Sequence, residues 1–312
     1  MTDYFRPLVQ IGPARPDTAL PLAGGWGWFT HAEVLSRSTP PRVVPAADIP
    51  ASVMARLTAP RPAMTGLTLD RPRIMGILNT TPDSFSDGGQ HNAVPDALRV
   101  AQEMVAAGAD ILDIGGESTR PGADFVPVSE EITRTAPVIA ALRGAGLQTP
   151  ISIDTRKAAV AEAAVSAGAN LVNDVSGFTF DPALGPLCQK MALPVCVMHA
   201  QGDPATMHLD PQYDNVLLDV FDALERQISM LEASGIPRGA ILADPGIGFG
   251  KTQDHNLALL ARLSLFHALG TPILLGVSRK RFIGTIGNAP QAQDRAPGSI
   301  AVALAGLGQG VQ

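Results

Sequence analysis

Polar side chains that could bind a ligand follow seven short apolar runs spread along the chain. The runs end in Asn79, Asp113, Asp154, Asn173 with Asp174, Met198 with His199, Asp244, and Ser278 with Arg279 and Lys280. Carboxylate and amide oxygens accept hydrogen bonds from N–H groups, and a lysine donates to a carbonyl oxygen. This set predicts a flat ligand with an amidine-like donor edge and a carbonyl, such as a pterin or guanine. The alternative is that these residues only close turns and cap helices.

Two long loops rich in hydroxyl groups and glycine follow the first two runs. Residues 79–89 (NTTPDSFSDGG) are longer than an ordinary strand-to-helix turn, which predicts a mobile lid or, alternatively, an ordered surface loop. Residues 117–122 (ESTRPG) include Arg120, which could bind phosphate or carboxylate through two hydrogen bonds. We expect both loops to border the ligand site.

A third loop, at residues 246–251 (GIGFGK), is similar to a phosphate-binding loop but has Pro245 where the first glycine belongs. Its glycines still let the backbone approach a flat ligand, and Phe249 can form a wall of the pocket. For His199 we favour a hydrogen-bonded structural role over that of a base. Metal binding by the carboxylates is the weaker interpretation, because no zinc-type or calcium-type ligand spacing accompanies them.

The apolar runs alternate with amphipathic helical patterns, which predicts strands joined by helices. The predicted strands are residues 73–78, 110–114, 150–153, 171–175, 194–198, 240–243 and 272–276. Strands that alternate with helices form a parallel sheet through right-handed crossovers. At this length we favour a TIM (β/α)8 barrel over a doubly wound open sheet. The carboxyl ends of barrel strands share one rim, so we expect the polar residues to meet there.

The first part of the chain differs from the rest. Residues 1–63 are rich in proline and show no alternation of strands and helices, so they form an N-terminal extension of unknown role. Residues 64–312 form the predicted barrel domain. Within it, residues 64–73 have Gly66 and an alternation of Leu67 and Leu69, which predicts a small hairpin on the barrel floor.

Composition argues against nucleic acid and membranes as partners. Of the 312 residues 46% are hydrophobic and 17% charged, with a net charge of −6 that would repel nucleic acid and anionic lipid. No stretch has the length of a membrane span or the layout of a signal peptide. Cys188 and Cys196 lack the spacing of a disulfide framework or a metal site, so we expect free thiols in a cytoplasmic protein.

Six motifs, in order along the chain, resemble the signatures of the dihydropteroate synthase family. They are MGILNTTPDSFSDGG (75–89), GADILDIGGESTRPG (108–122), ISIDT (151–155), VND (172–174), DPGIGFGK (244–251) and GVSRK (276–280). The resemblance covers residues 64–312. It implies a TIM barrel that joins 6-hydroxymethyl-7,8-dihydropterin pyrophosphate to p-aminobenzoate in folate synthesis and releases pyrophosphate. It also implies a cytoplasmic homodimer that uses Mg²⁺ and belongs to a class of sulfonamide targets.

The resemblance assigns roles to single positions. Polar contacts to the pterin ring fall to Asp154, Asn173, Asp244 and Lys280, and apolar contacts to Met198, Phe249 and Gly276. Asn79 matches the residue near the pyrophosphate and Mg²⁺. The p-aminobenzoate pocket is assigned to Phe85, Asp87, Thr119, Arg120 and Pro121, with Ser278 and Arg279 beside it. The expected catalytic residues are Asp87, Arg120, Asp154 and Lys280.

The implied chemistry is loss of pyrophosphate followed by attack of the arylamine. The electron-rich ring spreads the positive charge, so the protein has to stabilise charge on both sides of the breaking bond. The sequence departs from the family pattern at its end, because it stops at Gln312, before the eighth strand with its Arg-x-His-Asp motif and the last helix. We therefore expect a barrel one strand short, with weak pterin binding and slow turnover.

Two other functions share part of this pattern. A pterin-dependent methyltransferase barrel has similar aspartate and asparagine acceptors, but lacks the first loop (TPDSFSDGG, 81–89) and the Ser-Arg-Lys ending. A non-catalytic pterin-binding relative would fit the missing anion site near the end of the chain.

Overall fold

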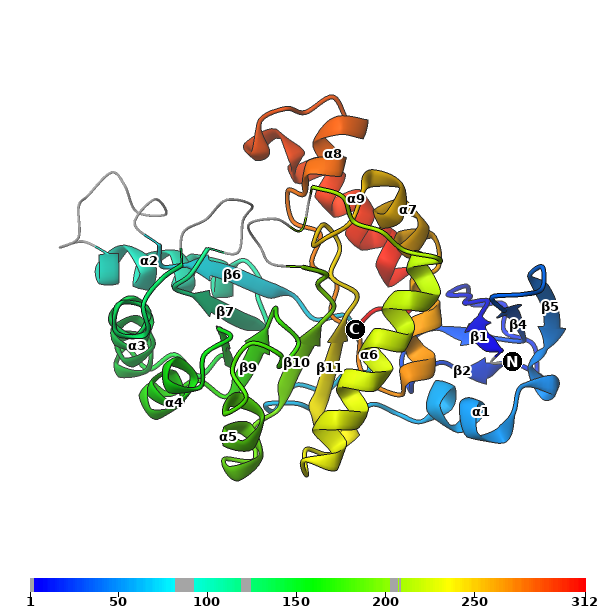
Figure 1. Cartoon of the computed structure of the whole chain (residues 1–312), viewed down its shortest axis with the longest axis horizontal. Coiled ribbons are helices and arrows are strands. Elements are labelled where there is room, and N and C mark those ends of the chain that lie inside the picture. Colours follow the sequence, from blue (N-terminus) through cyan, green and yellow to red (C-terminus); the bar gives the residue numbers. More distant parts are fainter. Residues whose placement is uncertain (1–2, 82–92, 119–124, 203–206, 208) are drawn as a thin grey trace.

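The computed structural model describes residues 3–81, 93–118, 125–202, 207 and 209–312, and its main feature is a curved parallel sheet (Figure 1). Six strands lie side by side in the order in which they occur in the chain. They are β6 (Met75–Asn79), β7 (Ile111–Gly115), β8 (Ile151–Asp154), β9 (Leu171–Asp174), β10 (Val195–Met198) and β11 (Ile241–Asp244). A doubly wound sheet reverses its strand order, whereas this one does not. The fold is a TIM barrel, as predicted.

Helices join the strands and cover the outer face of the sheet (Figure 1). They are α2 (Ala93–Ala106), α3 (Val128–Gly144), α4 (Ala158–Ala167), α5 (Leu184–Lys190), α6 (Val216–Ala233), α7 (Gln253–Ala261), α8 (Arg281–Ile286) and α9 (Ala296–Leu307), with 3-10 turns η4 (Arg238–Ala240), η5 (Leu263–Leu269) and η6 (Ala292–Arg295). Leu217, Leu224 and Ile228 of α6 are buried at the helical spacing that the sequence indicated. None of the described helices is long and apolar enough to cross a membrane.

The sheet has an apolar outer face and an inner face that carries both apolar and polar side chains, because successive side chains of a strand point to opposite faces. In β7, Leu112 and Ile114 belong to the main core under the helices. Ile111, on the other face, packs with Leu171 of β9. Asp113 shares the face of Ile111, so a buried carboxyl group stands inside the barrel.

A short hairpin closes the amino-terminal end of the barrel. Met64 and Leu67 exchange two backbone hydrogen bonds, of 2.9 and 2.8 Å. Met64 and Leu69 are buried against inner side chains at the amino ends of the strands. The predicted floor hairpin is confirmed.

Residues 3–58 form a small module of their own beside α6 (Figure 1). A three-stranded antiparallel sheet has the order β1 (Tyr4–Pro7), β4 (His31–Leu35), β5 (Arg42–Pro45), and β2 (Leu20–Pro21) pairs with β3 (Trp28–Phe29), followed by η1 (Ala46–Asp48) and α1 (Ala51–Thr58). The sequence pattern did not predict these strands, because they are only two to five residues long and several contain proline.

Ion pairs and hydrogen bonds attach this module to the barrel. Arg37 contacts Asp219 at 2.7 Å and Asp222 at 2.8 Å, both on α6. Trp26 Nε1 donates to the carbonyl oxygen of Leu307 at 3.0 Å, at the end of α9. The N-terminal module is therefore folded against the barrel helices.

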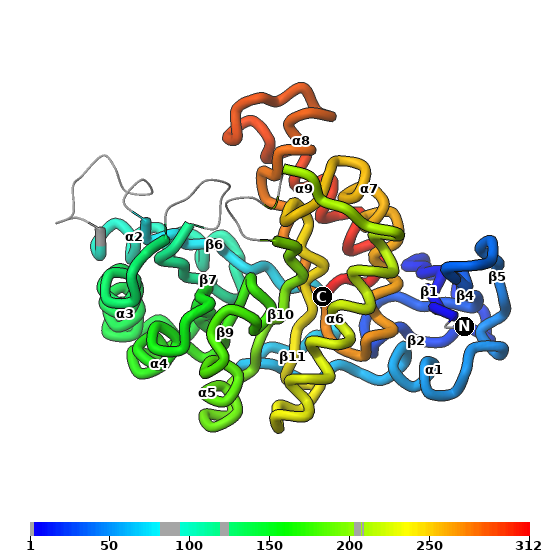
Figure 2. The backbone as a smooth tube through the Cα atoms, viewed as in Figure 1, coloured from blue at the N-terminus to red at the C-terminus, as the bar shows by residue number. Residues whose placement is uncertain are grey.

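The seventh predicted strand, residues 272–276, forms only a bridge. Ile273 pairs in parallel with Ala243 of β11, so the expectation of a full strand is wrong there. Beyond this bridge, Gln312 accepts hydrogen bonds from the backbone N–H of Arg73 (2.8 Å) and of Ile273 (3.1 Å). Gln312 thus lies between the two edges of the sheet, near β11 (Figure 2). Among the described residues, the parallel sheet has six strands, and the Ile273 bridge is the further pairing at the β11 edge.

Candidate active site

The carboxyl ends of the strands bring the residues predicted to contact a pterin to one rim. In the sheet register Asp154 lies beside Asn173, and Met198 lies beside Asp244. Burial lowers the pKa of Lys280 to about 8, while the nearby charges of Asp244 and Asp154 raise it. Lys280 is therefore close to carboxylates from two strands of the sheet. The sheet register and these charge interactions therefore bring Asp154, Asn173, Asp244 and Lys280 to one rim.

Gly115 leaves the space in which two rim side chains lie. It is paired with Asn79 of β6 and with Asp154 of β8. A Cβ atom at this position would lie 3.4 Å from Asp154 Oδ2 and 3.7 Å from Asn79 Oδ1. Glycine therefore keeps both oxygens uncovered on this side. Asn79 itself is exposed at the rim.

Two carboxyl groups lie close together, with Asp154 at the rim and Asp113 below it. Asp113 is 5% exposed, and its Oδ2 accepts a hydrogen bond from Asn173 Nδ2 at 3.1 Å. Its Oδ1 has no hydrogen-bond partner among the described residues. Burial raises the pKa of Asp113, and burial together with the charge of Asp113 raises the pKa of Asp154 well above its ordinary value. A ligand that brings N–H donors or positive charge would stabilise this pair.

Asp244 is oriented by the loop that follows it. Its Oδ1 accepts from the Gly246 N–H at 2.7 Å. A Cβ at Gly276 would lie 3.5 Å from its Oδ2, so glycine leaves that oxygen uncovered. The Nζ atom of Lys280 lies 4.0 Å from the ring centroid of Phe249, which fixes the lysine over a flat wall. Phe249 therefore lies in the site, as predicted.

Lys251 is held by protein groups instead of being free for a phosphate. Its Nζ lies 2.9 Å from the carbonyl oxygens of Gly246 and Phe249 and 3.0 Å from Nδ1 of His199. Burial and the charge of Lys251 lower the pKa of His199 to about 3. His199 is a neutral, hydrogen-bonded residue, which confirms its predicted role. From the sequence, Lys251 was only the last residue of a glycine-rich loop, and no role was predicted for it.

A second set of charged residues is here called the ion-pair cluster and consists of Glu117, Glu131, Arg156 and Lys157. These residues come from the segments that follow β7 and β8 and from α3. Lys157 Nζ is 2.6 Å from Glu131 and 3.2 Å from Glu117, and Arg156 Nε is 3.1 Å from Glu117. Burial raises the pKa of Glu117, but the hydrogen bonds from Arg156 and from the Val126 N–H outweigh it and hold the pKa below its ordinary value. This cluster was not predicted from the sequence.

The same residues hold together the two ends of the second loop. Glu117 Oε1 accepts from the Val126 N–H at 3.0 Å, and Lys157 Nζ donates to the Val126 carbonyl oxygen at 2.6 Å. Residues 117 and 126 are therefore linked through side chains. The loop's predicted site residues lie between them.

Several predicted site residues lie outside the described residues, and so does most of the loop predicted as a lid: Phe85, Asp87, Thr119, Arg120 and Pro121. Ser278 and Arg279 are described and exposed, directly before Lys280. The Arg279 N–H donates to Ser299 Oγ at 2.8 Å, and its φ of 53° turns the backbone sharply there. Both residues therefore border the rim on the side of Lys280.

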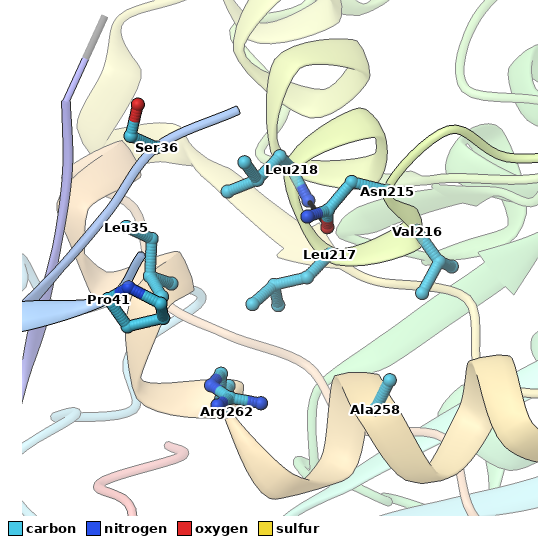
Figure 3. A pocket seen from close by; sticks show the side chains of 9 residues that line it. All are labelled: Leu35, Ser36, Pro41, Asn215, Val216, Leu217, Leu218, Ala258 and Arg262. Carbon is cyan, nitrogen blue, oxygen red and sulfur yellow. Dashed lines mark hydrogen bonds between the residues drawn. The ribbon is translucent and has the colours of Figure 1, made fainter. Parts of the chain in front are cut away.

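A separate cavity of about 250 Å³ lies between the N-terminal module and the barrel helices (Figure 3). It is lined by Leu35, Ser36, Pro41, Asn215, Val216, Leu217, Leu218, Ala258 and Arg262. Arg262 lies 3.2 Å from Glu33, and Asn215 caps α6 by accepting from the Leu218 N–H at 3.2 Å. Because these polar groups already serve the structure, the strand-end rim is the better candidate site.

The described residues hold no cluster of three or more histidine, cysteine, aspartate or glutamate side chains that could bind a metal. Mg²⁺ usually keeps several waters and takes one or two protein oxygens plus substrate phosphates. The exposed amide oxygen of Asn79 suits that kind of site. The rim therefore fits a Mg²⁺ ion held mainly by a phosphorylated ligand.

The rim offers acceptors and one cation, but no activated nucleophile is found among the described residues around it. Cys188 and Cys196 are free and buried, and burial raises the pKa of Cys188 to about 12 and that of Cys196 well above its ordinary value. Thiols in that state do not attack substrates. The arrangement suits binding and charge stabilisation of a flat, donor-rich ring.

Comparison with known proteins agrees with this site. The sequence profile of the family described as pterin binding enzyme matches residues 75–312. The dihydropteroate synthase of Escherichia coli is 45% identical over 236 residues, which are 76% of this chain and 83% of that protein. The dihydropteroate synthase of Synechocystis is 44% identical over 225 residues, 72% of this chain and 78% of that protein.

Solved structures give the same result. Yersinia pestis dihydropteroate synthase in a sulfonamide drug complex has a TM-score of 0.75 at 46% identity, covering 80% of this chain and 91% of that chain. Dihydropteroate synthase from Xanthomonas albilineans in complex with 7,8-dihydropteroate has a TM-score of 0.71 at 42% identity, covering 78% and 87%. The family profile begins at residue 75, after the N-terminal module.

Proposed function

Because the chain belongs to the pterin-binding enzymes as a dihydropteroate synthase, we propose that its strand-end rim holds the pterin ring during the condensation with p-aminobenzoate. The methyltransferase alternative has no support in these relatives, all of which are named for the synthase reaction. The steps of that reaction then fall to particular residues of this chain.

The order of side chains around the rim carries the assignment. Asp154, Asn173 and Asp244 follow one another on β8, β9 and β11, and Lys280 comes next. Around a 2-amino-4-oxo-dihydropterin, the ring N8–H, the 2-amino group, the N3–H and the 4-carbonyl follow in the same order. Three acceptors thus meet three donors, and the lysine meets the carbonyl oxygen. Phe249 and Met198 would contact the faces of the ring.

Asp154 would stabilise the positive charge that develops on the ring. When the bond from the methylene carbon to the pyrophosphate oxygen breaks, the electron pair leaves with the pyrophosphate and the ring becomes cationic. The pKa of Asp154 is raised by burial and by the neighbouring Asp113, so its ionised form gains more from a cationic ring than from the neutral substrate. The nitrogen of p-aminobenzoate then bonds to the methylene carbon and loses a proton to solvent or pyrophosphate.

The two loops would supply the second substrate's pocket. We assign p-aminobenzoate to Phe85, Asp87, Thr119, Arg120 and Pro121, with Ser278 and Arg279 at its edge. Asp87 would face the cationic ring and Arg120 the carboxylate or the departing anion. The linked residues 117 and 126 support this assignment, because they fix where the second loop leaves the barrel.

Asn79 would hold Mg²⁺ together with the pyrophosphate. When bound, Mg²⁺ supplies positive charge that stabilises the departing anion. A cytoplasmic location and a homodimer are part of the same proposal, and the two free, buried thiols suit a reducing compartment.

An assay with both substrates tests the proposal. Purified chain, Mg²⁺, dihydropterin pyrophosphate and labelled p-aminobenzoate should give labelled dihydropteroate and one pyrophosphate for each product formed. Asp244→Ala should reduce the amount formed, because it removes the acceptor for the N3–H and 2-amino edge. Product at the same rate from Asp244→Ala, or none from the unaltered chain, would contradict it.

A further inference from the structure

The side-chain amide of Asn173 is oriented by a second buried residue. Its Nδ2 donates to Asp113 Oδ2 at 3.1 Å, from β9 to β7 with β8 between them. A carboxylate oxygen only accepts hydrogen bonds, so the amide has to present an N–H to it. The amide oxygen of Asn173 is left for other partners, and none of the described residues donates to it.

This orientation determines whether the rim offers a hydrogen-bond acceptor or a donor between Asp154 and Asp244. Asn173 stands there opposite the 2-amino group of the proposed ring. An amide oxygen at that point accepts a hydrogen bond from an amino group, whereas an amide N–H would instead suit a carbonyl at position 2. A site of fixed orientation rejects the mismatched ring, because a polar group would be left unpaired.

Asp113 costs the fold stability where it stands. It is a buried carboxyl on a strand, its Oδ1 has no partner among the described residues, and no cation contacts it there. Burial of such a group is unfavourable, and a β-branched apolar residue would suit a strand better. A role in packing alone does not explain an aspartate at this position.

We propose that Asp113 is a specificity-determining positioning residue, which holds the Asn173 amide so that the site selects a 2-amino ring over a 2-oxo ring. It does not touch the reacting atoms but acts through Asn173. The proposal rests on the proposed function, because it requires a pterin ring at the rim.

Binding of two matched rings to Asp113→Val tests this. The probes are 6-hydroxymethylpterin, with an amino group at position 2, and 6-hydroxymethyllumazine, with a carbonyl there. By calorimetry the unaltered chain should prefer the pterin. In Asp113→Val the ratio of the two affinities should fall about tenfold, because Asn173 becomes free to turn its N–H to the carbonyl. Circular dichroism establishes that the variant is folded.

Ser152→Ala is the matched control. Ser152 is buried on β8 and pairs with Asp113 in the sheet register, so its loss disturbs the same layer without removing the acceptor of Asn173. The affinity ratio should stay as in the unaltered chain. A ratio that falls equally in Ser152→Ala would mean that any change in this layer loosens the site, and it would overturn the proposal.

A double-mutant cycle separates positioning from a general effect. Asn173→Ala should lower the ratio by itself, and adding Asp113→Val should change it little further. An unchanged ratio in Asp113→Val, or an equal fall in the Asn173→Ala background, would overturn the role of Asp113. If the unaltered chain bound neither ring, the proposed function would fail instead.

Discussion

Two buried polar clusters in this barrel are built in opposite ways. In the ion-pair cluster, Glu131 is completely buried and faces Lys157, which is 3% exposed, at 2.6 Å. In the barrel interior, Asp113 is buried and Asp154 is half-buried, neither forms an ion pair within 4 Å among the described residues, and the charge of Asp113 acts on Asp154. The pKa of Glu117 in the first cluster is lowered, whereas the pKa values of Asp113 and Asp154 in the second are raised.

This difference separates groups that stabilise the fold from groups that await a ligand. Carboxylates with cations and backbone donors around them are satisfied before any substrate arrives. Carboxyl groups without such partners cost stability until a donor-rich or cationic molecule binds. The satisfied cluster holds the ends of the second loop, and the unsatisfied one lies under the rim. Substitutions in the two clusters should therefore have different effects, on stability in the first and on catalysis in the second.

The largest effect should come from breaking the satisfied cluster. Lys157→Met leaves Glu131 buried with Thr155 as its remaining side-chain donor, and we expect the free energy of unfolding to fall by about 3–5 kcal/mol. Urea unfolding measures it. Arg99→Met, which breaks an exposed i,i+4 pair with Glu103, is the control and should cost only about 0.3–0.5 kcal/mol. Equal losses in the two variants would show that the cluster is not a source of stability.

The unsatisfied cluster should respond in catalysis instead. Asp154→Asn removes the charge that stabilises the cationic ring, and we expect kcat to fall by about 10²–10³-fold, or about 2.7–4 kcal/mol. Its free energy of unfolding should not decrease, because a half-buried carboxyl with a raised pKa is replaced by a neutral amide.

Asp174→Asn is the matched control for this prediction. Asp174 is a buried carboxyl at a strand end and burial raises its pKa too, but unlike Asp154 it accepts hydrogen bonds from the N–H groups of Ser176 and Phe178, both at 2.7 Å. Its substitution should reduce stability and leave kcat closer to normal. A loss of stability in Asp154→Asn as large as in Asp174→Asn would erase the distinction.

Lys251 combines features of both clusters, because its ammonium group has hydrogen-bond partners in the protein and it also contacts the loop at the rim. Lys251→Met leaves the carbonyl oxygens of Gly246 and Phe249 without this donor, and we expect a loss of about 1–3 kcal/mol in stability. The dissociation constant for the pterin should also rise, since Phe249 supports Lys280. Thermal unfolding and calorimetry measure these, with the exposed Lys190→Met as control. A variant with weaker folding but unchanged pterin affinity would assign Lys251 to the fold alone.

The sequence predicted the barrel and the rim because both follow from local patterns. Strand ends, apolar periodicity and the position of Asp154, Asn173, Asp244 and Lys280 after successive runs are all short-range features. A parallel barrel then brings them together without further information.

What the sequence could not predict depends on contacts between distant segments. Asp113 reads as another turn-closing aspartate until its contact with Asn173, 60 positions away, is seen. The Lys251–His199 contact spans 52 positions. The strands of the N-terminal module are too short and proline-rich to give a period, so only pairing across the module defines them.

The smallest expected effect, and the most direct contrast, is in the pH dependence of stability. A carboxyl whose pKa is raised by folding favours the folded state at low pH, and this contribution is lost as the pH rises from the unfolded pKa through the folded one. Asp154 should therefore make stability fall as the pH rises above its unfolded pKa of about 3.9. Glu117, with a lowered pKa, contributes to stability above its unfolded pKa of about 4.3 and loses that contribution as the pH falls through the folded pKa.

A tenfold difference in proton affinity between the folded and unfolded states corresponds to about 1.4 kcal/mol. Unfolding measured from pH 3 to pH 8 should show the fall in stability with rising pH reduced in Asp154→Asn, and the loss of stability at acid pH reduced in Glu117→Gln. If both variants changed the profile in the same pH range and direction, the two clusters would not differ in the way that their contacts indicate.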